Sequence, residues 1–109
     1  MHDIGIRLCL EKYGDGNGKL QEKEGPALAE QMLSELGFKK DVIERVSFLV
    51  GHHHTYTGID GLDYQILVEA DFLVNLFEGN TDTAHIRATY DNIFRTETGK
   101  KICREMFGL

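Results

Sequence analysis

Three groups of polar side chains in this sequence have the types that bind metal ions. His2 and Asp3 are neighbours at the start of the chain, residues 52–54 are three consecutive histidines, and Asp71 lies within an apolar helical stripe. Neutral imidazole and carboxylate are common ligands of divalent ions. Burying either group without a partner costs several kcal/mol. A shared metal ion is therefore one explanation for all three groups.

Each group also has an ordinary explanation. A His-Asp pair is often a surface pair or the start of a helix, and a histidine near a helix C-terminus is favoured by the helix dipole. His53 alone would be read as a satisfied core residue. Asp71 falls between Leu67 and Val74 on the predicted inward side, where it could accept a buried hydrogen bond, whereas Glu69 is expected to face the opposite way. The residue types alone leave both explanations open.

The apolar periodicity predicts an all-α chain, a single-domain bundle of five to six helices over residues 1–109. With 109 residues and one proline, Pro26, the chain has room for one core. Pro26 is expected near the first turn of its helix, where a missing N–H does no harm. The predicted helices cover about 4–13, 22–37, 41–50 and 62–77, followed by one from Asp82 (or Thr81) and one from about Thr98.

The glycine-rich stretch after the first predicted helix also resembles a calcium-binding EF-hand loop. Its candidate positions are Asp15, Asn17, Gly18, Leu20 and Glu24. Tyr13 stands where the first ligand should be an aspartate, and no second EF-hand follows. A solvated turn is the alternative, and the sequence favours it.

Composition limits the function classes. Eighteen acidic against twelve basic residues give a formal charge of −6, which argues against duplex nucleic acid as a partner. No run of about 18 apolar residues is present, so no membrane span is predicted. The two cysteines, Cys9 and Cys103, are expected to be free thiols in a cytoplasmic protein.

The order of four segments resembles that of the HD-domain metal-dependent phosphohydrolases. The resemblance covers residues 2–77 and rests on residues 2–5 (HDIG), 24–29 (EGPALA), 42–46 (VIERV) running into His52-His53, and 69–71 (EAD). It implies an HD-like helical fold.

The resemblance also implies roles for individual residues. His2, Asp3 and Asp71 match the family's metal ligands. His52, His53 or, in a shifted register, His54 match histidines that bind a second metal or the substrate phosphate. Asp3 and Glu24 are the expected catalytic residues, with Glu22 as another acid near the site.

Two departures from the family pattern change these expectations. The family's first histidine ligand lies on a helix ahead of the His-Asp doublet, and only Met1 precedes it here. The chain thus looks N-terminally truncated relative to the family, and a homodimer is predicted through the groove left by that helix. Gln21 stands where members with two metals carry a histidine. One divalent ion is therefore expected, with Mn, Mg, Fe, Ni and Zn all possible.

The function implied by the resemblance is metal-dependent hydrolysis of a phosphomonoester. The expected partner is a small phosphorylated substrate, such as a nucleotide or another metabolite. The alternative is a catalytically inactive regulatory HD domain that binds a metal or a nucleotide, because the chain lacks the first histidine. A calcium-binding or purely structural helical module is a third reading.

Overall fold

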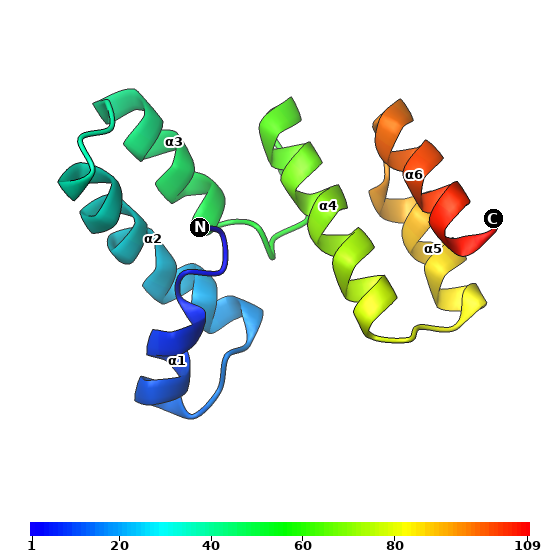
Figure 1. The fold of residues 1–109 in the computed structure, drawn as a ribbon, viewed down its shortest axis with the longest axis horizontal. Helices are drawn as coiled ribbons and strands as arrows, with labels where there is room; N and C mark the ends of the chain where they lie inside the picture. Colours follow the sequence, from blue (N-terminus) through cyan, green and yellow to red (C-terminus); the bar gives the residue numbers. More distant parts are fainter. The chain divides into compact units, whose positions relative to one another are not determined.

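The structure, a computed structural model, describes residues 1–109 as six α-helices without a strand, which confirms the all-α prediction (Figure 1). The helices group into two compact units, Met1–Thr55 and Tyr56–Leu109, each described separately below. No helix combines the length and the apolarity needed to cross a bilayer. The first unit contains α1 (Ile6–Tyr13), α2 (Gly18–Glu35) and α3 (Lys40–Val50), and the second contains α4 (Leu62–Glu78), α5 (Thr83–Ile93) and α6 (Glu97–Phe107).

Helix α2 begins one turn earlier than the sequence predicts. The Asn17 side chain caps it by accepting a hydrogen bond from the Leu20 N–H at 3.0 Å, and Asp15 in turn accepts one from the Asn17 N–H. Pro26 consequently lies near the middle of α2, so the prediction of a first-turn proline was wrong. Pro26 has no N–H to donate to the carbonyl of Glu22 four residues earlier.

Close packing at Gly25 brings together the three segments that matter for the first unit. A Cβ on Gly25 would lie 2.6 Å from Cγ1 of Val50, at the end of α3. A Cβ on Gly5, just before α1, would lie 3.1 Å from the Gly25 nitrogen. The chain's N-terminal turn and the end of α3 therefore meet the same turn of α2, and Figure 1 shows the N-terminus beside the end of α3.

The second unit packs α4, α5 and α6 around an apolar cluster of Leu76, Ile86, Phe94 and Cys103. Helices α5 and α6 begin at side-chain caps, which confirms the predicted start of α5 at Asp82. Both cysteines are free and buried, and burial raises the pKa of each thiol.

Glu69 of α4 is buried in the second unit, and the expectation that it faces away from the core was wrong. Its side chain accepts hydrogen bonds from the Thr96 hydroxyl at 2.7 Å and from Gln65 Nε2 at 2.6 Å. The backbone N–H groups of Arg95 and Thr96 donate to the same carboxylate, each at 3.1 Å. These donors hold the pKa of Glu69 below its usual value although burial acts to raise it.

The face of α4 that the sequence assigned to the core is also displaced. Tyr64, Val68 and Leu76 are the buried apolar residues, whereas Val74 and Phe77, both predicted inward, are exposed. The helix is apolar over most of its circumference, so its stripe did not define a single inward direction.

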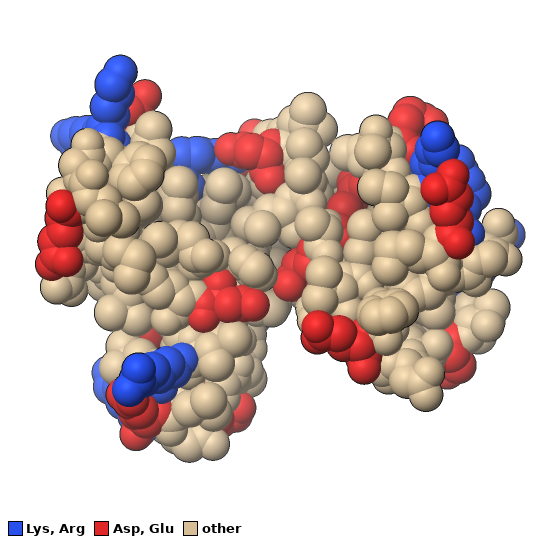
Figure 2. Space-filling view, in the orientation of Figure 1, with Lys and Arg blue, Asp and Glu red and all other residues tan.

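Charged side chains are mixed on the face of the molecule shown in Figure 2. There, lysines and arginines form small groups with acidic neighbours. These mixed groups occur in a chain whose formal net charge is −6.

Candidate metal centre

The His2-Asp3 doublet lies on a turn ahead of α1 and not on the helix itself. The Ile4 N–H donates to the Met1 carbonyl and the Ile6 N–H to the Asp3 carbonyl, each at 3.0 Å. Within the turn, His2 Nε2 lies 3.1 Å from Asp3 Oδ2. The second carboxylate oxygen, Oδ1, faces the end of α3.

His53 meets that oxygen from the turn that follows α3. Its side chain is fully buried, with Nε2 3.3 Å from Asp3 Oδ1 and Nδ1 2.9 Å from the Val50 carbonyl oxygen. A carbonyl can only accept, so Nδ1 carries a proton and donates it. Nε2 then faces the carboxylate either with a second proton, as an imidazolium, or with a lone pair. A cation held between a lone pair on Nε2 and the carboxylate would bind both.

His54 supplies a third donor atom close to the first two. Asp3, His53 and His54 each offer a ligand atom, and these atoms all lie within 4.8 Å of one another. The rings of His53 and His54 are 4.0 Å apart between centroids. His54 Nε2 also lies 3.4 Å from Gln21 Oε1 of α2. The structure therefore brings together three of the predicted site residues within the first unit.

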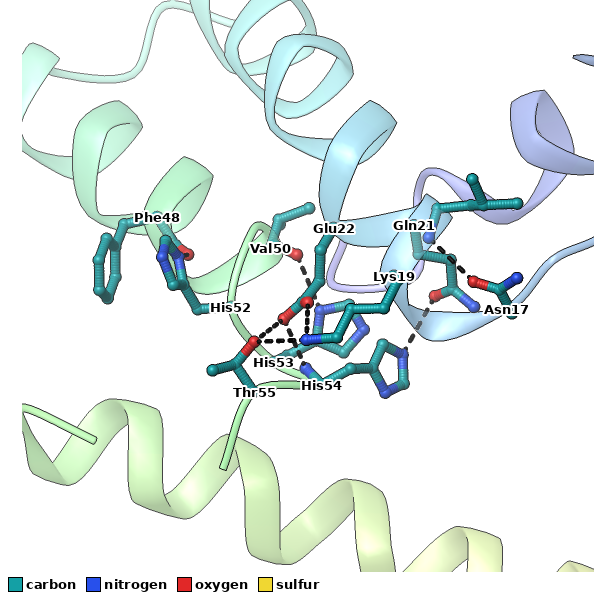
Figure 3. A network of polar contacts seen from close by, with 11 residues as sticks. Asn17, Lys19, Gln21, Glu22, Phe48, Val50, His52, His53, His54 and Thr55 are labelled. Atoms are coloured by element: carbon teal, nitrogen blue, oxygen red, sulfur yellow. Dashed lines mark hydrogen bonds and ion pairs between the residues drawn. The ribbon is translucent and has the colours of Figure 1, made fainter. Parts of the chain in front are cut away.

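Glu22 connects the histidine turn to α2 (Figure 3). One of its oxygens accepts hydrogen bonds from the Thr55 hydroxyl at 2.7 Å and from the His54 N–H at 3.1 Å. The other lies 3.3 Å from Lys19 Nζ. Burial acts to raise the pKa of Glu22, but the donors from Thr55, Lys19 and His54 hold it below its usual value.

His52 has different surroundings from its two neighbours. Its Nδ1 lies 2.7 Å from the Phe48 carbonyl oxygen, and its ring stacks on the Phe48 ring at 4.0 Å between centroids. His52 is not in the cluster that Asp3 forms with His53 and His54.

Glu24, a predicted catalytic residue, lies with Tyr13 and Lys12 in the structure. Its Oε1 accepts the Tyr13 hydroxyl at 2.6 Å and lies 3.1 Å from Lys12 Nζ. The hydrogen bond from Tyr13 and the charge of Lys12 lower its pKa. Because α2 begins at Gly18, the second half of the EF-hand-like stretch is helical, and Glu24 lies within α2.

Asp71, the third ligand implied by the resemblance, belongs to the second unit. It lies on α4 and is partly buried. Its role as a ligand with His2 and Asp3 stays a prediction.

The sequence suggested Glu22 as an acid near the site, but it did not predict how Gly5, Gly25 and Glu22 assemble this centre. Gly5 and Gly25 permit the close approach of the N-terminal turn to α2, and Glu22 anchors the histidine turn. A glycine inside a helical pattern often marks such a contact, and Gly25 carried that signal. The partner of each glycine depends on the tertiary fold and has no signature in the sequence.

Comparisons with protein-family models, with curated proteins and with solved structures find no match to this chain. The geometry of Asp3, His53 and His54 and the motif resemblance are therefore the two features that point to a function.

Proposed function

We propose that this chain binds one divalent transition-metal ion through Asp3, His53 and His54 and uses it to hydrolyse a small phosphomonoester. The observation that carries the proposal is the convergence of three ligand atoms within 4.8 Å, at the meeting point of the N-terminal turn and the end of α3. The motif resemblance supports the hydrolytic part. It also assigns His2 and Asp71 as further ligands.

The distances suit a metal ion. Zinc–nitrogen and zinc–oxygen bonds of about 2.0–2.1 Å at a tetrahedral angle put two ligand atoms about 3.3 Å apart. His53 Nε2 and Asp3 Oδ1 are separated by 3.3 Å. These two atoms therefore already have the spacing of two ligands of one ion, and the ligand atom of His54 lies within 4.8 Å of both.

The orientation of His53 also suits a ligand. Histidines that bind metals generally donate their other ring N–H to a carbonyl or carboxylate, which fixes the tautomer. The Val50 carbonyl accepts this bond from Nδ1, so Nε2, on the side of Asp3, is the ring nitrogen that can offer a lone pair to an ion. Two imidazoles and one carboxylate favour zinc, nickel, iron or manganese over calcium.

The ion and the residues around it would have different roles in hydrolysis. A divalent ion held there lowers the pKa of a bound water toward neutrality and neutralises charge on a phosphate. Asp3 keeps one oxygen for the ion while His2 contacts the other at 3.1 Å, which fixes the carboxylate plane. Full burial of His53 keeps water from competing for its lone pair.

Metal titration of the purified protein tests the binding part. After removal of bound ions with a chelator, calorimetric titration with Zn²⁺, Mn²⁺ and Ni²⁺ should show one site. His53→Ala and Asp3→Asn should each weaken it by at least about tenfold, because each removes a ligand. His85→Ala is the matched control, since His85 is exposed on α5. Equal affinity in all three variants would exclude the site.

Hydrolysis is tested with the same proteins. The metal-loaded wild type should release phosphate from p-nitrophenyl phosphate or from nucleoside monophosphates, and His53→Ala should not. A protein that binds the ion and hydrolyses neither substrate would favour the regulatory alternative.

A further inference from the structure

We infer that Glu22 is a positioning residue of the metal centre, which holds His54 against the first turns of α2 so that its ring faces Asp3 and His53. The inference rests on the proposed function and deepens it. The resemblance suggested Glu22 only as an acid near the site, whereas its contacts indicate a different task.

The anchor acts on the backbone of the histidine turn. Glu22 Oε2 accepts the His54 N–H at 3.1 Å and the hydroxyl of the next residue, Thr55, at 2.7 Å. Lys19 Nζ contacts both Glu22 Oε1, at 3.3 Å, and the Thr55 hydroxyl, at 3.4 Å. Figure 3 shows these contacts as a closed triangle beside His54. All donors to Glu22 therefore come from the histidine turn or from α2 itself.

The side chain of His54 is held by the same helix turn. A Cβ on Gly18 would lie 2.7 Å from His54 Cγ and 2.9 Å from its Cδ2, so the ring packs where Gly18 has no side chain. Gln21 Oε1 lies 3.4 Å from His54 Nε2. Gly18, Gln21 and Glu22 are spaced i, i+3 and i+4 and thus share one face of α2.

This arrangement gives Glu22 no proton to supply. It accepts from three donors, which favour the carboxylate form. Its contact with the backbone of His54 is also independent of which ring nitrogen binds the ion. Glu22 therefore sets where the His54 ring is, without touching the ion.

Three variants test the inference in the full chain. Glu22→Ala removes the anchor, Glu22→Gln keeps an oxygen that can accept from the His54 N–H and Thr55, and Gly18→Ala displaces the ring from the other side. Glu30→Ala is the control, because Glu30 is an exposed residue of α2 two turns further on. The readouts are Zn²⁺ affinity by calorimetry, the ring-nitrogen NMR shifts of His54 in the metal-free protein, and thermal unfolding.

We expect Glu22→Ala and Gly18→Ala to lower Zn²⁺ affinity by about 10–100-fold, the range for residues that orient metal ligands. Both should also move the His54 ring signals, while those of His85 stay in place. Glu22→Gln should recover most of the lost affinity, and Glu30→Ala should match the wild type. A purely structural Glu22 would lower the unfolding temperature without moving the His54 signals.

Wild-type affinity in Glu22→Ala, with unmoved His54 signals, would overturn the inference while leaving the metal site standing. A wild type that binds no ion would overturn the proposed function instead. In that case the ring signals in the metal-free variants still decide whether Glu22 positions His54.

Discussion

Glu69 keeps its charge inside the second unit because donors converge on both of its oxygens. Burying a carboxylate without partners would be costly, and it would then take up a proton. Here a hydroxyl, an amide and two backbone N–H groups offset that cost. Glu69 thereby ties α4 to the first turn of α6.

We predict that this contact makes the second unit sensitive to acid. The pKa of Glu69 is lowered in the folded state, so its contribution is complete above the unfolded value of about 4.3 and is lost as the pH falls through the folded value. Glu69→Gln should lower the free energy of unfolding by about 1.5–3 kcal/mol at pH 7 and by less at pH 3. Urea unfolding at both values measures this, with Glu78→Gln, an exposed position of α4, as control. An equal loss at both pH values would contradict the prediction.

Gly99 is the second residue with a testable role in this contact. A Cβ there would overlap Glu69 Oε1 and would lie 2.7 Å from Thr96 Oγ1. Replacing a helical glycine with alanine ordinarily gains about 1 kcal/mol. We predict the opposite sign for Gly99→Ala, a loss of about 1–3 kcal/mol, because α6 has to move away from Glu69. Chemical denaturation measures it, and Thr98→Ala, at an exposed neighbouring position, should be close to neutral.

Helix α2 is the element that organises the first unit. Its first turns hold His54, and its middle receives both Gly5 and Val50 at Gly25. Pro26 removes one backbone hydrogen bond from this helix, and its ring packs close to Gly51.

The crossing at Gly25 predicts a coupled pair of substitutions. Gly25→Ala places a Cβ 2.6 Å from Val50 Cγ1 and should cost about 1–3 kcal/mol by overpacking. In Gly25→Ala/Val50→Ala the clash is gone, so the double variant should be more stable than the sum of the two single changes implies. A double-mutant cycle by urea unfolding gives the coupling energy. If the free-energy changes of the two single variants simply add in the double variant, the predicted steric clash between positions 25 and 50 is contradicted.

The sequence predicted the positions of the helices better than it predicted which side of each helix is buried. The apolar periodicity and caps such as Asp82 locate the helices, because those signals are local. The start of α2 was missed because the glycine run masked the cap at Asn17. Glu69 was misjudged because most of its donors belong to Arg95 and Thr96, which are distant in sequence. The sequence offered Asp3, His53 and His54 as candidates for the site, but their proximity depends on contacts at Gly25.

Because Asp3, His53 and His54 all belong to the first unit, an ion bound by them should stabilise that unit. An ion at one hundred times its dissociation constant stabilises the folded state that binds it by about 2.7 kcal/mol. Hydrogen exchange should slow in peptides covering residues 1–5 and 51–55 when Zn²⁺ is added. If the resemblance is right about Asp71, exchange in α4 should also slow, and Asp71→Ala should remove that effect. Unchanged exchange in residues 1–5 would contradict metal binding by Asp3.

The homodimer prediction concerns the oligomeric state of the whole chain. Light scattering of the purified protein measures it directly, and we expect twice the monomer mass of 12.3 kDa. A well-behaved monomer over a range of concentrations would contradict the prediction.

The contact between Asp3 and His53 joins positions 50 residues apart. An ion shared by these side chains would act as a removable cross-link that closes a long loop of backbone. By the chain-entropy relation used for disulfides, closing a loop of that length is worth about 4 kcal/mol. Chelation should then loosen the beginning of the chain and expose it to proteases, so that the availability of metal would govern how long the protein survives.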